Sequence, residues 1–152
     1  MNDIPNDPLS EFSIAVFTIN GLLMRSGEEV TKPLGHSSAR WQVLGRAGHK
    51  PQTVARMARD IGNSRQSVQR IAHALVREGL ATYIPDTSDK RAPLLQLTPR
   101  GSQILNTIHE KDAQWSAELM TKLDAAKLTK ATQLLAEISS ELGQYLMIKG
   151  EK

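Results

Sequence analysis

The sequence contains no cysteine and no long apolar run. Without cysteine, disulfides, thiolate catalysis and thiol redox sensing are excluded, and a zinc site would need His and carboxylates alone. No apolar run approaches the roughly 18 residues of a membrane span. Asp3, Asp7 and Glu11 occupy the region where an export signal would carry positive charge. We therefore expect a cytoplasmic protein with no membrane contact.

Residue patterns typical of enzymes and metal sites are also missing. The histidines at 36, 49, 73 and 109 show no ligand spacing such as HxxxH. The carboxylates are scattered, with no pair suited to acid–base catalysis. Gly45, Gly48 and Lys50 do not form a phosphate-binding loop. We expect no catalytic residue, no metal site and no cofactor.

Positive charge is concentrated in the middle of the chain. The 152 residues carry a formal net charge of only +3, but residues 36–101 contain eleven Lys and Arg against four Asp and Glu. The rest of the chain has an excess of acidic residues. Such a concentration is expected of a surface that meets a polyanion. The alternative is a solvated face on a protein with another role.

Apolar spacing predicts a mostly helical chain. Residues 1–8 should form a flexible tail, and a stripe from Phe12 to Leu23 should lie on a long helix that fades before Lys32. Shorter helices are predicted over 36–51, 53–63 and 64–80. Their expected N-caps are Ser37 or Ser38, then Thr53, then Ser64, and their expected ends are Gly48, Gly62 and Gly79.

The period then changes from that of a helix to that of a strand. Ala81–Pro85 and Pro93–Leu97 predict a hairpin closed by a polar loop. Thr98 is a natural cap for the next helix, with Pro99 at the first helical position. Asp124 can cap a last helix, whose apolar residues from Leu128 to Tyr145 form a heptad-like seam.

Two short helices followed by a hairpin predict a helix-turn-helix with a wing. A helix fits the major groove of B-DNA, where Gln suits adenine and Arg suits guanine. If Val68, Ile71 and Leu75 face the core, the opposite face of the second helix carries no acid. The residues expected at the groove are Ser64, Arg65, Gln66, Ser67, Gln69, Arg70 and His73.

The tip of the hairpin is predicted to reach the adjacent minor groove. Lys90 and Arg91 suit its negative potential. Asp89 is expected to structure the wing, either by orienting an arginine or by binding loop N–H groups. Ser37, Ser38 and Thr53, at helix starts, are candidates for phosphate contacts. A solvated charged turn is the plainer alternative for the tip.

Residues 53–101 resemble the winged-helix core of the MarR family of bacterial transcriptional regulators. The matching segments are "TVARMARDIG", "SVQRIAHALVREGLA" and "SDKRAPLLQLTPRG". The family's wing pattern is matched by Asp89, Lys90, Arg91, Leu97, Thr98 and Gly101. The order of the flanking helices fits as well. One departure is Thr82-Tyr83, where the family often has a basic residue.

The resemblance implies a mainly α fold with a small β-wing: a winged helix-turn-helix with N- and C-terminal dimerisation helices. Residues 9–35 and 99–150 would form the dimerisation region, and residues 36–98 would form the DNA-binding region. It also implies a homodimer on an inverted-repeat operator in double-stranded DNA, acting as a repressor released by a small molecule, such as an aromatic anion. Met24, Arg25 and Trp41 are candidates to line the effector site. The alternative is a winged-helix protein-interaction module that does not bind DNA.

Overall fold

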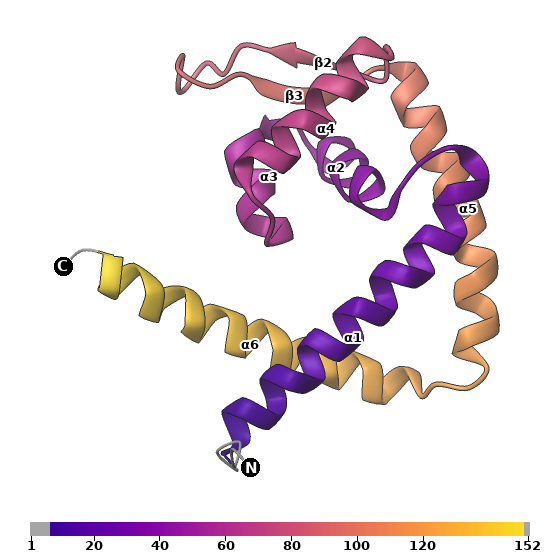
Figure 1. Cartoon of the computed structure of the whole chain (residues 1–152), viewed down its shortest axis with the longest axis vertical. Helices are drawn as coiled ribbons and strands as arrows, with labels where there is room; N and C mark the ends of the chain where they lie inside the picture. The colour runs from indigo at the N-terminus through magenta and orange to yellow at the C-terminus, as the bar shows by residue number, and fades with distance from the viewer. Residues whose placement is uncertain (1–6, 151–152) are drawn as a thin grey trace, which may run out of the picture. The chain divides into compact units, whose positions relative to one another are not determined.

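The computed structural model describes residues 7–150, and its elements confirm a mainly helical fold with a small β-wing (Figure 1). The chain forms two compact units that divide within the fifth helix, after Asp112. The elements are α1 (Pro8–Thr31), the 3-10 turn η1 (Lys32–Leu34), α2 (Ser38–His49), β1 (Gln52–Thr53), α3 (Val54–Ile61), α4 (Arg65–Arg77), β2 (Ala81–Ile84), β3 (Leu94–Leu97), α5 (Pro99–Met120) and α6 (Ala125–Gly150).

Helix α1 begins where its capping residues place it. The Asp7 carboxylate accepts the N–H groups of Leu9 and Ser10 at 2.9 and 3.0 Å, and Pro8 occupies the first turn, where its missing N–H costs nothing. Of the expected tail, residues 1–6 lie outside the described residues, while Asp7 and Pro8 belong to the start of α1.

The core of the first unit is shared by the helices of the winged helix, by strand β3 and by the first half of α5. Each contributes side chains that are almost completely removed from water: Leu44 from α2, Met57 from α3, Val68 and Leu75 from α4, Leu95 from β3 and Ile108 from α5. Burying such side chains is the main stabilising contribution to the fold. Helix α4 is therefore held along its whole length by the core.

Two glycines end the helices of the helix-turn-helix as predicted. Gly62 and Gly79 follow α3 and α4 with φ values of 74° and 72°, a left-handed conformation that glycine adopts without strain. The prediction for Gly48 was wrong, because α2 continues through His49. A Cβ at Gly48 would lie 2.5 Å from the Leu105 side chain, so this glycine permits close packing of α5 on α2.

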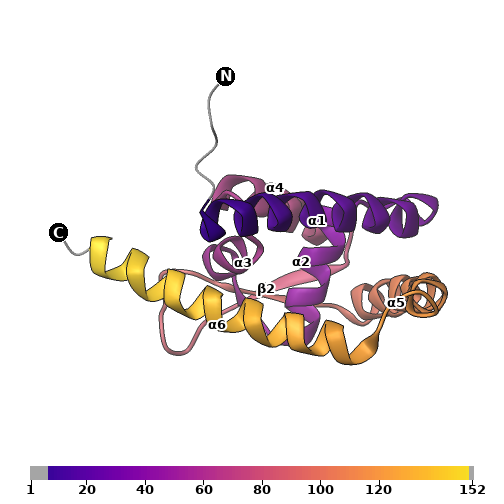
Figure 2. The ribbon, with the colours of Figure 1, turned by 90° about the horizontal axis from the view of Figure 1, so that it is seen from below.

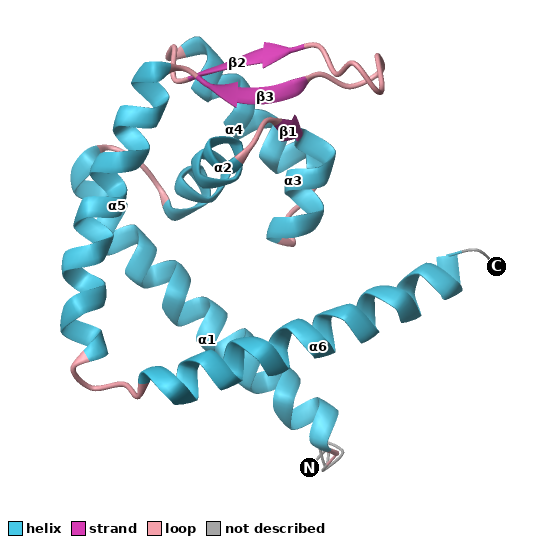
Figure 3. Cartoon of the chain, turned by 180° about the vertical axis from the view of Figure 1, so that it is seen from behind, coloured by secondary structure: helices cyan, strands magenta, loops and turns pink. Residues whose placement is uncertain are grey.

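The wing is a three-stranded antiparallel sheet in the order β1-β3-β2 (Figure 3). Its two hairpin strands were predicted. The structure adds their register, which places Ala81 opposite Leu97 and Ile84 opposite Leu94. The two-residue strand β1, which pairs Gln52 with Leu95, was not predicted. Three views agree that the loop joining β2 and β3 projects beyond α3 and α4 (Figures 1, 2 and 3).

The return from the wing into α5 is locked to the end of α4. Thr98 donates its N–H to the Leu80 carbonyl at 3.1 Å and its hydroxyl to the Gly79 carbonyl at 2.7 Å. The same hydroxyl oxygen accepts the Gly101 N–H at 3.1 Å, which confirms Thr98 as the cap of α5. A Cβ at Gly101 would lie only 1.9 Å from the Leu80 carbonyl oxygen, so only glycine permits this approach.

Apolar side chains on both terminal helices are exposed in the single chain. On α1, Phe17 is 74% exposed and Leu23 is 56% exposed. On α6, which begins at an Asp124 cap as predicted, Leu135 is 43% exposed and Tyr145 is 54% exposed. No helix among the described residues is both long and apolar enough to span a membrane.

Candidate nucleic-acid interface

Helix α4 presents a polar face opposite its buried one. Ser64 caps the helix, with its Oγ accepting the Ser67 N–H at 3.1 Å. Val68, Ala72 and Leu75 are buried, and Ile71 is half-buried. A shallow depression of about 560 Å³ lies on the other side, lined by Arg65, Gln66, Gln69, Arg70 and His73. The structure therefore brings together five of the seven predicted groove-facing side chains on one surface, which we call the recognition face, while Ser64 and Ser67 stand at the start of the same helix.

The cations of the recognition face form no ion pair with the acidic residues that the structure describes. Across residues 7–150, the ion pairs within 4.0 Å join Arg40 to Glu78, and Arg46 and Arg56 to Asp60. Arg65 and Arg70 are in none of these pairs and are exposed. Their charge is therefore directed to solvent at the N-terminal half of α4, where the helix dipole also favours an anion.

The wing tip carries two exposed cations on a loop that is bridged by its own hydrogen bonds. The Asp89 carboxylate accepts the Arg91 N–H at 3.0 Å. Of the two roles expected for Asp89, orienting an arginine side chain or binding a loop N–H, the structure shows the second. Asp86 accepts the Ser88 N–H and hydroxyl at 2.9 and 2.7 Å, and these hydrogen bonds lower the pKa of its carboxyl. Both turns leave Lys90 and Arg91 exposed.

The three candidates for phosphate contacts differ in accessibility. Ser37 and Thr53 are half-buried caps that accept the N–H groups of Arg40 and Arg56, each at 3.2 Å. Ser38, in contrast, is only 4% exposed, and its N–H donates to the Glu28 carboxylate at 2.8 Å. The structure thus contradicts a phosphate contact from Ser38, because the close packing of α2 on Gly27 of α1 covers it.

A contact between the wing and the recognition face was not predicted. Nε2 of Gln69 lies 2.9 Å from the Tyr83 hydroxyl oxygen and 2.9 Å from Nε2 of His73. The Tyr83 ring lies edge-on to His73, with ring centroids 6.1 Å apart. The i, i+4 spacing of Gln69 and His73 predicts their proximity, but no local pattern places Tyr83 beside them.

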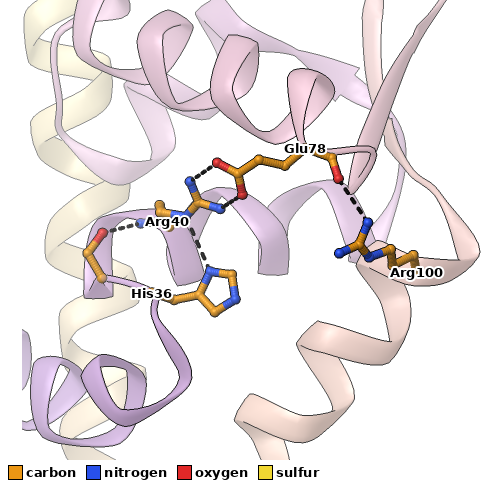
Figure 4. A network of polar contacts seen from close by, with 5 residues as sticks. His36, Arg40, Glu78 and Arg100 are labelled. Atoms are coloured by element: carbon orange, nitrogen blue, oxygen red, sulfur yellow. Dashed lines mark hydrogen bonds and ion pairs between the residues drawn. The ribbon is translucent and has the colours of Figure 1, made fainter.

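The C-terminal end of α4 is held by a polar network (Figure 4). Arg40 of α2 makes a bidentate ion pair with Glu78, and the Arg40 Nε donates to Nδ1 of His36 at 3.3 Å. Arg100 of α5 donates to the Glu78 carbonyl at 3.4 Å. The hydrogen bond from Arg40 lowers the pKa of Glu78, while burial and the charge of Arg40 lower the pKa of His36.

The candidate effector-site residues lie on α1 and α2, and Met24 and Trp41 contact different residues. Sδ of Met24 accepts from Nε2 of Gln42 at 3.0 Å and from the Ser38 hydroxyl at 3.7 Å. The Trp41 ring lies 6.4 Å from the ring of His109 on α5. Arg25 is exposed. Met24 therefore packs between α1 and α2, whereas Trp41 packs toward α5.

Comparison with known proteins identifies relatives of the chain. Uncharacterized proteins of Mycobacterium bovis and Mycobacterium tuberculosis are 38% identical to the chain over 123 residues, which is 81% of the chain and 86% of each relative. The chain belongs to their family. No family model matches it.

Solved structures identify the fold as that of MarR regulators. MarR from E. coli is 24% identical with a TM-score of 0.68, over 83% of this chain and 95% of that one. Staphylococcus aureus MarR in complex with salicylate and kanamycin is 19% identical with a TM-score of 0.71, over 88% and 91%. A variant of S. aureus MepR bound to an oligodeoxyribonucleotide is 16% identical with a TM-score of 0.55, over 86% and 97%. The MarR resemblance of the sequence is therefore confirmed in the fold.

Proposed function

We propose that the chain is a dimeric transcription regulator that binds duplex DNA sequence-specifically. One observation carries the proposal: Arg65 and Arg70 of the recognition face are exposed and pair with no acid among the described residues, on a helix-turn-helix with a projecting basic wing. Helix α4 would enter the major groove, and Lys90 and Arg91 would enter the neighbouring minor groove. The fold shared with an oligodeoxyribonucleotide-bound MepR variant supports this proposal.

The side chains divide by what they would contact. The side chains that line the depression on α4 would contact base edges, where Arg70 suits guanine and Gln66 suits adenine. Ser64 and Ser67, with Ser37 and Thr53, stand at helix starts and suit phosphates. Ser38 is left out because it is buried.

Dimerisation is proposed from the exposed apolar faces of α1 and α6. Side chains such as Phe17 and Leu146, 74% and 66% exposed, are costly to leave in water along whole helices. A symmetric pairing of two chains would cover both faces and present two recognition helices about one helical turn apart. Sedimentation at micromolar concentration should show a dimer, and a stable monomer would contradict the pairing.

We propose that the chain is a repressor and that a small molecule releases it from DNA. The MarR that resembles it was solved with salicylate, an aromatic anion. A ligand shifts an equilibrium only by its preference for one state, so an effector must favour a spacing of the recognition helices that does not fit DNA. Binding to a selected duplex should then weaken in the presence of salicylate or a related aromatic carboxylate, with Met24, Arg25 and Trp41 as the first positions to vary.

Selection of bound duplexes from a random DNA pool tests the function directly. Recovery of an inverted repeat is expected, with a preference at one position of each half-site that is lost in Arg70→Ala. Lys130→Ala, which removes the same charge from an exposed position on α6, is the control and should keep the full preference. A pool with no enrichment at low salt would overturn DNA binding and favour the alternative, a winged-helix module that binds a protein.

A further inference from the structure

Gln69 stands on the recognition face with half of its hydrogen-bonding capacity already used. Its amide nitrogen lies 2.9 Å from both the Tyr83 hydroxyl oxygen and Nε2 of His73. A glutamine amide offers two N–H donors on nitrogen and two acceptor sites on oxygen. When Nε2 of His73 is unprotonated, both donors are satisfied within the protein. The side chain then presents only its oxygen to a ligand.

Tyr83 is held firmly enough to impose this state. It lies opposite Leu95 in the wing, and residues that pair directly across two strands point to the same face of the sheet. Leu95 is fully buried, so the tyrosine ring is directed toward α4, where it lies edge-on to His73. Burial raises the pKa of Tyr83, so the side chain is a neutral hydroxyl at neutral pH, and its oxygen accepts the Gln69 N–H at 2.9 Å.

We propose that Tyr83 determines which base Gln69 selects by occupying its amide nitrogen. The inference rests on the proposed DNA binding. A free glutamine reads adenine with two bonds, donating to N7 and accepting from the N6 amino group. An acceptor-only Gln69 keeps only the second bond, which the N4 amino group of cytosine supplies equally well. Guanine and thymine present oxygen acceptors at this edge and are disfavoured.

The same duplex selection, run on variants, separates this role from a structural one. The position read by Gln69 is the one whose preference disappears in Gln69→Leu. There the wild type should accept adenine and cytosine equally. Tyr83→Phe frees one N–H and should shift the preference toward adenine roughly fivefold, the value of about one hydrogen bond. In the Gln69→Leu background, Tyr83→Phe should change nothing at that position.

Thr82→Val is the matched control, since Thr82 is the exposed neighbour of Tyr83 on β2 and no hydrogen bond joins its hydroxyl to another described residue. It also removes a hydroxyl group from this strand and should leave every base preference unchanged. A melting curve of each variant verifies that it is folded. Uniform weakening by Tyr83→Phe at all positions would show a purely structural role and overturn the inference.

A base analogue tests the same hydrogen bond by changing the DNA. Replacing the adenine read by Gln69 with 7-deazaadenine removes N7, so wild-type affinity should be unchanged, while Tyr83→Phe should lose roughly fivefold. Wild-type preference for adenine alone, for guanine or for thymine would overturn the role of Tyr83, as would sensitivity to the analogue. Failure to select any duplex would instead overturn the DNA-binding proposal itself, so the two failures are distinguishable.

Discussion

The substitution Gly101→Ala should be strongly destabilising, although it places a good helix former in a helix. Its Cβ would lie 1.9 Å from the Leu80 carbonyl oxygen and 2.9 Å from the carbonyl carbon. Both are backbone atoms, so no side-chain rotation relieves the contact. To restore even a 3.0 Å separation from that oxygen, the start of α5 must move by about 1 Å from the chain that follows α4.

That movement breaks the connection between the wing and the recognition helix. The bonds from Thr98 to the Leu80 and Gly79 carbonyls, at 3.1 and 2.7 Å, stand directly beside the contact. Overpacking costs about 1–3 kcal/mol, and the two hydrogen bonds contribute about 1 kcal/mol each. Better helix propensity returns about 1 kcal/mol. We expect a net loss of about 2–4 kcal/mol in the free energy of unfolding.

Urea unfolding at one fixed protein concentration measures this loss, since the stability of a dimer depends on concentration. Gly45→Ala is the matched control: Gly45 lies inside α2, and no neighbouring atom stands within 4 Å of the place that a Cβ would take there. This control should stabilise by about 0.5–1 kcal/mol. If Gly101→Ala unfolds at the same urea concentration as wild type, the close approach at Gly101 does not carry the expected energetic cost.

Four further results are expected. The logarithm of DNA affinity should fall steeply with the logarithm of salt concentration, by about 0.9 per phosphate neutralised, and a flat dependence would contradict the charged interface. Arg70→Ala should cost about 1–3 kcal/mol of binding and relax one base position, whereas Arg91→Ala should weaken binding to all operators with a narrow A·T-rich flank; wild-type binding by both folded variants would refute the assigned faces. The pKa of Glu78 is lowered on folding, so the Arg40–Glu78 pair stabilises the folded state at pH values above the usual glutamate pKa of 4.5. The difference in stability between wild type and Glu78→Gln should therefore be largest at pH 7 and should decrease as the pH falls below 4.5. A difference that stays constant from pH 7 to 3 would rule this out. Mild hydroperoxide should not release DNA in a manner that a thiol reductant reverses, because the chain has no cysteine.

Local signals explain why most elements were predictable. Ser64, Thr98 and Asp124 act as caps because their side-chain oxygens accept the N–H three residues later, an interaction contained within a few residues of sequence. The hairpin followed from two short extended segments, 81–85 and 93–97, joined by a polar loop. The exposed cations of α4 followed from its 3.6-residue period, which assigns opposite faces to core and solvent.

Features that depend on distant segments were beyond sequence reasoning. Ser38 is a suitable cap residue by type, but α1 covers it and Ser37 takes that role. Gly48 has the appearance of a helix end, yet its lack of a side chain admits Leu105 from 57 residues later in the chain. Tyr83 reaches Gln69 only because the wing folds back on α4. Each contact requires the tertiary arrangement to be known first.

The network around Glu78 has a consequence for how regulation and sequence preference would evolve. It ties the end of α4 to the starts of α2 and α5 (Figure 4). Under the proposed function, the recognition face would therefore move together with the rest of its winged helix. An effector that altered the distance between the two winged helices of a dimer would change whether an operator is bound, and would leave unchanged which bases each recognition face prefers. Substitutions on the recognition face would then change the operator without changing the response to the effector.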